Sequence, residues 1–332
     1  MSAKVRLGDR EVNTIGYGCM GLSQAYEPCE ESQGITALNA VLDMGYDHLD
    51  TAALYGFGHN EELLNKAIGH RRNEYFLASK CGLFRDRSGK REINGRPEVL
   101  KKTCEDSLRR LGTDCIDLHY LHRIDLNIPI EESLGAFTEL RDEGKIRYIG
   151  ISEPSLETLE RASAFCEVAA VQSELSLWTR SPNDLIAKRC QEKGITFVAY
   201  SPLGRGFLGG NIVDMEVLDQ SDIRHTMPRF KGDSFEQNLG RIGELGVLAA
   251  SLNVTAAQLA LAWVVAQGPN VMAIPGTRFA NRAKDNLAVS EILFDASVID
   301  EAGMILNPDN ILGERWGDKI MREVDSEQYR YV

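Results

Sequence analysis

The sequence has no long apolar run, no excess of basic residues and no paired cysteine motif. Its most apolar stretch, residues 256–266, is interrupted by Gln258 and falls short of the roughly 18 residues of a membrane helix. The 332 residues include 37 Lys and Arg against 49 Asp and Glu, a formal net charge of -12. Because non-specific nucleic-acid binding depends on clustered positive charge, we expect neither a nucleic-acid partner nor a membrane span.

The cysteines and the two chain ends bear on the cellular compartment. Seven cysteines without Cys-x-x-Cys spacing indicate reduced thiols rather than a disulfide framework. Residues 1–6 contain no apolar signal region, and residues 329–332 match no retention or lipidation motif. These features predict a cytoplasmic protein.

Short β-rich runs alternate with amphipathic helical patterns from about residue 35 onward, which is typical of βα units around a parallel sheet. The helical pattern is clear at residues 97–111, 131–144 and 156–165; the first of these begins at Pro97 and ends before Gly112. We expect eight strands, at residues 14–18, 46–50, 75–80, 115–122, 146–152, 168–173, 195–201 and 271–275.

Eight such units favour a closed (β/α)8 barrel, formed by residues 1–332 as a single domain. Residues 5–14 predict a β-hairpin that caps the bottom of the barrel, and residues 204–236 predict a long loop after the seventh strand, a candidate lid. A doubly wound sheet is the alternative, because Gly16 to Gly21 spells G-x-G-x-x-G after a strand. That motif requires a helix at Gly21, whereas residues 22–28 are polar and turn-like, so we interpret the glycines as a loop at the barrel mouth.

Four reactive side chains fall at the carboxyl ends of adjacent predicted strands, where barrel enzymes place their active sites. Asp50, Lys80 and His122 end the second, third and fourth strands, and Tyr55 follows Asp50 in the next loop. Burying a Lys/Asp pair is costly, so this combination predicts a catalytic site. His119 and His122 lie on opposite faces of one strand, and no cluster has zinc spacing, so we expect no metal.

Several motifs, in order along nearly the whole chain, resemble those of the aldo-keto reductase superfamily. They are residues 50–56 (DTAALYG), Lys80, residues 117–122 (DLHYLH), residues 150–153 (GISE), Gln172, residues 200–206 (YSPLGRG) and residues 274–278 (IPGTR). The resemblance implies a (β/α)8 barrel that binds a nicotinamide cofactor without a Rossmann domain and reduces aldehydes or ketones.

The resemblance also implies a role for each catalytic residue. Tyr55 would protonate the developing alkoxide as the general acid while a hydride goes to the carbonyl carbon. Lys80 would lower the pKa of the Tyr55 phenol, and Asp50 would hold the Lys80 ammonium in place. His122 would orient the carbonyl oxygen.

The implied cofactor is NADPH (NADP+), because Arg278 and Arg282 supply guanidinium groups where a 2′-phosphate would lie. Ser152 and Gln172 would hold the nicotinamide carboxamide, and Tyr200 would stack on the ring. The full set of predicted cofactor-binding residues is Met20, Asp50, Ser152, Gln172, Tyr200, Ser201, Leu203, Arg205, Gly206, Gly276, Thr277, Arg278, Arg282, Asp285 and Asn286, of which Asp285 and Asn286 would face the adenine.

Two positions depart from the better-known monomeric members: Glu153 stands where many have Asn, and Gly276 where many have Lys. The contacts to the carboxamide and the pyrophosphate therefore remain open. Phe57, Arg123 and Trp178 follow predicted strand ends and are the candidate substrate residues.

Two other functions are compatible with the same residues. A Schiff-base aldolase could use the Lys80 amine as a nucleophile near Asp50 and Tyr55 without any cofactor. A noncatalytic regulatory protein, like the channel-associated β-subunits of the superfamily, could retain the cofactor site without turnover.

Overall fold

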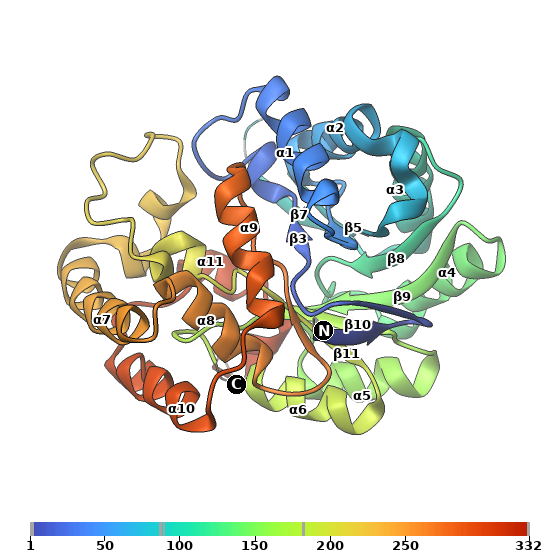
Figure 1. Ribbon diagram of the computed structural model, residues 1–332. Coiled ribbons are helices and arrows are strands. Elements are labelled where there is room, and N and C mark those ends of the chain that lie inside the picture. The colour runs from blue at the N-terminus through green and yellow to red at the C-terminus, as the bar shows by residue number, and fades with distance from the viewer. Residues whose placement is uncertain (1–2, 86–87, 89, 181–182, 331–332) are drawn as a thin grey trace.

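The computed structural model describes residues 3–85, 88, 90–180 and 183–330, and its central feature is a sheet of eight parallel strands (Figure 1). The strands lie in the order β12-β11-β10-β9-β8-β5-β4-β3. Ile15 and Ala273 form a parallel bridge between the two edges, which closes the sheet into the predicted barrel. The bounds are β3 (Tyr17–Gly18), β4 (His48–Asp50), β5 (Phe76–Cys81), β8 (Ile116–Leu121), β9 (Ile146–Ser152), β10 (Ala170–Glu174), β11 (Thr196–Tyr200) and β12 (Val271–Ala273).

Helices surround the barrel and connect its strands. They are α1 (Glu31–Asp43), α2 (His59–Ile68), α3 (Pro97–Leu111), α4 (Ile130–Asp142), α5 (Leu156–Phe165), α6 (Asn183–Lys193), α7 (Gly232–Ser251), α8 (Ala256–Val265), α9 (Ala280–Ala288), α10 (Ala296–Ile305) and α11 (Asp318–Met321). Local sequence sets their ends: Pro97 occupies the first turn of α3, and Gly112 ends it in the left-handed conformation. The three predicted helices are therefore confirmed as α3, α4 and α5.

Nine short 3-10 helices occur in the described connections. They are η1 (Met20–Leu22), η2 (Tyr55–Gly58), η3 (Gly69–Glu74), η4 (Gly204–Gly209), η5 (Ile223–Thr226), η6 (Pro228–Phe230), η7 (Val289–Glu291), η8 (Pro308–Asn310) and η9 (Asp325–Arg330). Three of them, η4, η5 and η6, belong to the predicted long loop after the seventh strand, and α7 begins within its last residues.

The barrel interior is filled by side chains and closed at one end by a hairpin. Strands β1 (Lys4–Leu7) and β2 (Arg10–Asn13) pair antiparallel, as predicted. Val5, Leu7 and Val12 of this hairpin join the buried cluster that holds Phe76 and Met272 of the barrel strands. In Figure 1 the dark blue hairpin lies beside β10 and β11. The barrel therefore has one capped end and one open end.

The doubly wound alternative is wrong, because the sheet closes and no α-helix begins at Gly21. The glycines serve the closing seam instead. A Cβ atom on Gly276 would lie 2.5 Å from the carbonyl oxygen of Gly18, and one on Gly18 would lie 2.7 Å from the oxygen of Ile274. This close backbone approach leaves no room for a Cβ atom at position 276, where many superfamily members have a lysine.

Three segments outside the βα repeat surround the open end. The first is the hairpin of β6 (Leu83–Arg85) and β7 (Arg91–Ile93), the second is the loop of residues 201–231, and the third is the C-terminal segment, residues 308–330. Within the described ranges, no single helix is long and apolar enough to cross a membrane. Helices α7 and α8 together have the length and apolar composition of such a span, but they are bent by 90° at their junction.

Candidate active site

The four predicted catalytic side chains meet at the open end of the barrel. Lys80 on β5 forms an ion pair with Asp50 at the end of β4, and Lys80 Nζ also donates to the carbonyl oxygen of Thr51 at 2.8 Å. The side chains of Lys80 and Asp50 are only 1% and 3% exposed. Lys80 Nζ lies 5.3 Å from the centre of the Tyr55 ring, and that ring meets the His122 imidazole edge-on at 6.0 Å. The structure therefore brings together the four residues that strand-end reasoning grouped.

Burial and neighbouring charges set the protonation of this group. Burial would lower the pKa of Lys80, but Asp50 and Tyr55 outweigh it and raise that pKa, so Lys80 is a cation. Burial raises the pKa of Tyr55, and the opposing effect of Lys80 is smaller, so the phenol keeps its proton at neutral pH. The predicted effect of Lys80 on Tyr55 has the right sign, but burial exceeds it.

His122 is neutral. Burial, and then the nearby charges of Arg123 and Lys80, hold its pKa well below the usual histidine value. Its Nδ1 atom is buried without a hydrogen-bond partner among the described residues. A neutral imidazole can donate a hydrogen bond to a carbonyl oxygen, which matches the predicted orienting role. His119 points to the other side of the strand, where it packs on Phe137.

A cavity of about 740 Å³ runs from these residues across the barrel mouth. Most of the predicted cofactor residues line it. They are Met20, Asp50, Ser152, Gln172, Tyr200, Ser201, Leu203, Arg205, Gly206, Gly276, Thr277, Arg278 and Arg282. Tyr55, His122 and Arg123 line it as well, so catalytic and predicted cofactor residues share one cavity.

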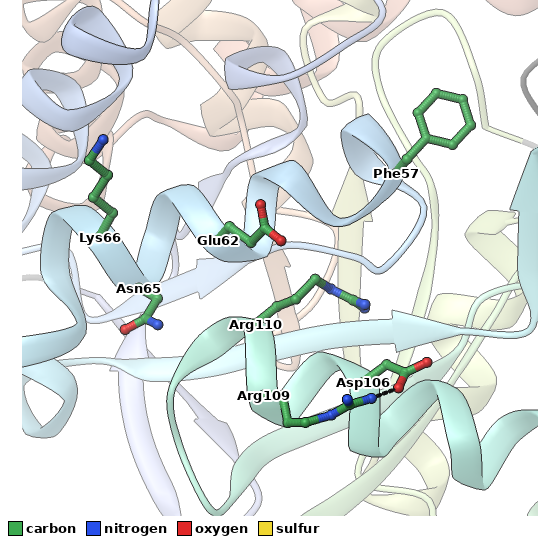
Figure 2. A pocket seen from close by; sticks show the side chains of 7 residues that line it. All are labelled: Phe57, Glu62, Asn65, Lys66, Asp106, Arg109 and Arg110. Atoms are coloured by element: carbon green, nitrogen blue, oxygen red, sulfur yellow. Dashed lines mark hydrogen bonds and ion pairs between the residues drawn. The ribbon is translucent and has the colours of Figure 1, made fainter.

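Five predicted site residues do not line this cavity, and one of them is Lys80, which is buried against Asp50. Asp285 and Asn286 lie further along α9, where Asn286 is buried and Asp285 is exposed. Trp178 is buried against Phe207. Phe57 is 65% exposed and lines a separate groove between α2 and α3. Figure 2 shows its ring at the edge of that groove, pointing away from the others.

Phe57 and Trp178, two of the three candidate substrate residues, lie outside the cavity for a local reason. The backbone of Phe57 takes a left-handed conformation (φ 58°), which turns its ring outward two residues after Tyr55. Trp178 comes four residues after β10 ends at Glu174, where the chain already folds back into an aromatic cluster with Phe207 and Phe230. Of the three candidates, only Arg123 lies in the cavity.

The side chain of Glu153 binds the C-terminal segment and does not line the cavity. Its carboxylate receives two hydrogen bonds from Arg315, at 3.1 and 2.8 Å, and further bonds from Ser326 Oγ and the backbone N–H of Glu174. Burial alone would raise the pKa of Glu153, but Arg315 outweighs it and lowers the pKa to about 2. Arg315 also forms an ion pair with Glu327 at 2.8 Å, so it links Glu153 to a second position in the C-terminal segment. Glu153 therefore replaces the usual Asn with a structural ion pair.

Two predicted cofactor arginines already have protein partners. The Arg205 guanidinium lies 4.5 Å from the Trp316 ring and 3.7 Å from a Glu174 carboxylate oxygen. Arg278 forms an ion pair with Glu27 and donates to the carbonyl oxygens of Glu27 and Pro28. By contrast, Arg282 stacks on Phe279 at 4.9 Å and has no carboxylate partner within the described ranges.

Two loops meet across the cavity. The backbone N–H of Ile223 donates to the carbonyl oxygen of Ala25 at 2.8 Å, and the Arg224 guanidinium lies 5.1 Å from the centre of the Tyr26 ring. Ala25 has a positive φ of 78°. The predicted loop after the seventh strand therefore covers the cavity, in contact with the loop that follows β3.

The sequence interpretation missed the cavity walls supplied by the β6–β7 hairpin and the C-terminal segment. Leu83, Arg85 and Arg91 come from the hairpin, and Trp316 and Ile320 from the C-terminal segment. One feature of the sequence indicated the hairpin: the connection from Lys80 to Pro97 is longer than most connections between a strand and the following helix. Nothing in the sequence marked the C-terminal segment.

Comparisons with known proteins agree with this architecture. A model of the aldo/keto reductase family matches residues 14–306. The aldo-keto reductase yakc, NADP(+), of Schizosaccharomyces pombe is 36% identical over 328 residues, 96% of this chain and 96% of that protein. Among solved structures, the glycerol dehydrogenase AKR11B4 from Gluconobacter oxydans has a TM-score of 0.84 at 29% identity and covers 92% of this chain and 96% of its own. An aldo-keto reductase from Klebsiella pneumoniae in complex with NADPH has a TM-score of 0.73 at 26% identity, covering 93% and 96%.

Proposed function

Because the chain belongs to the aldo/keto reductase family, we propose that it reduces an aldehyde or ketone to an alcohol with NADPH. The observation that carries this proposal is the buried Asp50–Lys80 ion pair beside a protonated Tyr55 and a neutral His122. Asp50, Tyr55 and His122 line a cavity of about 740 Å³, which also holds most of the predicted cofactor residues. The relative from Schizosaccharomyces pombe carries NADP(+) in its name, which supports the choice of cofactor.

The cavity fits a nicotinamide dinucleotide. The Tyr200 hydroxyl is buried there without a partner among the described residues, and its ring presents a flat surface near the catalytic group. Ser152 and Gln172 place side-chain hydroxyl and amide groups beside it. At the far end, Thr277 and Arg282 flank the start of α9, where backbone N–H groups favour phosphate. Arg282, free of carboxylate partners in the described chain, would bind the 2′-phosphate.

When bound, the reduced cofactor supplies a hydride to the carbonyl carbon. The side chains of the protein position the carbonyl group and supply the proton. Neutral His122 donates a hydrogen bond to the carbonyl oxygen and fixes its position. Tyr55 transfers its proton to that oxygen as negative charge develops, and Lys80 stabilises the phenolate that remains. Asp50 holds Lys80 as a cation throughout.

The same geometry disfavours the aldolase alternative. A Schiff base requires an unprotonated amine that can reach the substrate carbonyl. Lys80 is instead protonated, almost fully buried and engaged by Asp50 and the Thr51 carbonyl. Borohydride in the presence of an aldehyde should therefore leave Lys80 unmodified.

The test is NADPH oxidation by the purified protein with a panel of aliphatic and aromatic aldehydes and ketones, with the alcohol product identified by mass. Stoichiometric conversion of cofactor and carbonyl supports the proposal. Tight NADPH binding without turnover of any carbonyl would contradict it and favour the regulatory alternative.

A further inference from the structure

Three arginines converge on the part of the cavity next to the catalytic group. Arg123 follows His122 directly and is 6% exposed, Arg91 lies on β7, and Arg85 lies on β6. All three line the same cavity as Tyr55 and His122. None of them belongs to the four catalytic residues, and the cofactor interpretation does not use them.

The arrangement is unfavourable for the protein alone. Arg85 and Arg91 are directly opposite each other in the β6–β7 ladder, where like charges destabilise a strand pair. Burial, together with Arg123 and Arg85, lowers the pKa of Arg91. Such a cluster of like charges, kept at the mouth of an active site, is typical of a site for an anion.

The hydrogen-bonding capacity of these arginines is only partly used. Arg123 Nη1 donates to the carbonyl oxygen of His122 at 2.7 Å and to Ser152 Oγ at 3.3 Å, which fixes the guanidinium plane. Arg91 Nε donates to Glu323 at 2.8 Å. Arg123 Nε and Arg91 Nη2, however, are buried and have no partner among the described residues. Unpaired buried donors are costly, so a ligand that accepts from them would be stabilised.

The carboxylates near this cluster neutralise only part of its charge. Glu153 is held by Arg315 through two hydrogen bonds, and Glu323 forms an ion pair with Arg91. Asp50 is bound to Lys80. Within the described ranges, Arg123 forms no ion pair of its own, so positive charge remains next to the carbonyl position.

We propose that the physiological substrate carries an anionic oxygen group, a carboxylate or a phosphate, which Arg123 and Arg91 bind while its carbonyl group meets Tyr55 and His122. The proposal rests on the reductase function proposed above and specifies its substrate class. Arg85, exposed at the rim, attracts the anion into the cavity. Arg123 makes the closer contact because it is rigid and adjacent to His122.

Matched substrates test the proposal: 4-oxobutanoate against butanal for a carboxylate, and glyceraldehyde 3-phosphate against glyceraldehyde for a phosphate. We expect wild type to prefer at least one charged partner in kcat/KM. Arg123→Gln and Arg91→Gln should each lower kcat/KM for that charged substrate about 10- to 100-fold, the usual cost of one charged hydrogen bond, and lower it much less for the neutral partner. Glu323→Gln, which releases Arg91, should increase the preference. Arg109→Gln, on the outer face of α3 and 74% exposed, is the matched control and should change neither substrate.

Several outcomes would overturn the proposal. One is an equal fall for charged and neutral partners. Another is a larger dissociation constant for NADPH in Arg123→Gln, which would show that Arg123 binds the cofactor. A third is no preference for either anion in wild type.

Equilibrium binding separates this proposal from the reductase function. If no carbonyl is reduced, the complex with NADPH is titrated with 4-oxobutanoate or glyceraldehyde 3-phosphate while cofactor fluorescence is followed. Saturable binding that Arg123→Gln abolishes would support the anion site although the reductase function had failed. Absence of binding would refute the anion site as well.

Discussion

The ion pair between Arg315 and Glu153 makes a sharp prediction about how the C-terminal segment is held. Arg315→Met keeps much of the side-chain volume and removes the only cation that bonds directly to the Glu153 carboxylate among the described residues. Both side chains are at most 3% exposed. Breaking a buried pair from one side costs about 3–5 kcal/mol, because an uncompensated charge stays buried. At an unfolding entropy of about 2.1 cal/mol/K per residue, we expect the midpoint of thermal unfolding of the 332-residue chain to fall by about 4–7 °C.

The sign of the pH dependence follows from Glu153. Arg315 holds its pKa at about 2, below the value of about 4.3 for an unfolded glutamate. The pair therefore stabilises the fold above about pH 4.3, and this contribution is lost as the pH falls toward 2. Without Arg315, the largest opposition to the effect of burial is removed, so we expect the pKa of Glu153 to rise and the carboxyl to accept a proton more readily. The deficit of Arg315→Met relative to wild type should thus be larger at pH 8 than at pH 5.5.

Urea unfolding followed by tryptophan fluorescence measures the effect at both pH values, with Trp316 as a neighbouring reporter. Arg109→Met, which removes an exposed arginine from α3, should change stability by less than about 0.5 kcal/mol. The double variant Glu153→Gln/Arg315→Met should recover only part of the loss, because it removes the buried charge of Glu153 but still takes Arg315 away from Glu327. A loss below about 1 kcal/mol, or an equal loss at pH 8 and pH 5.5, would refute the reasoning.

Three further predictions concern the seam, the cofactor and the imidazole. Gly276→Ala should destabilise the protein by about 1–3 kcal/mol, because the new Cβ atom would lie 2.5 Å from the backbone oxygen of Gly18. Gly135→Ala, in open space on α4, is the control and should be neutral or stabilising. Thermal unfolding of both variants measures the difference. Arg282→Gln should lower kcat/KM for NADPH about 10-fold or more and leave NADH nearly unchanged; wild type that already uses NADH as well as NADPH would contradict it. Because burial keeps His122 neutral and Tyr55 protonated, kcat/KM for reduction should be flat from about pH 6 to pH 9. A change in kcat/KM near pH 6.5 that is absent in His122→Gln would contradict this and show that the imidazole titrates.

The barrel and the proximity of the predicted catalytic residues could be predicted because both depend on local pattern. Each strand is a short β-rich run, and the carboxyl ends of parallel strands lie at one end of a barrel, so Asp50, Lys80 and His122 had to be neighbours. The closing contact of Gly18 with Gly276 also lies between two predicted strand ends.

The rest depends on contacts between residues far apart in the chain. Glu153 and Arg315 are 162 positions apart, and their pairing requires a left-handed turn (φ 55°) at Glu153 that no local pattern announces. The position of Phe57 outside the cavity could not be predicted either, since a positive φ turns its ring outward. Arg91 reaches the active site only through a hairpin inserted into a βα connection. Such insertions follow no period in the sequence.

The most direct test of the central claim is the rate of hydride transfer in Tyr55→Phe, measured in a single turnover with saturating NADPH and an aldehyde that wild type reduces. The phenylalanine keeps the ring that meets His122 and removes only the proton donor. We predict a rate about 10²- to 10⁴-fold below wild type, with the dissociation constant for NADPH unchanged. A rate within about 3-fold of wild type would show that the proton comes from another group, and the proposed role of Tyr55 would be wrong.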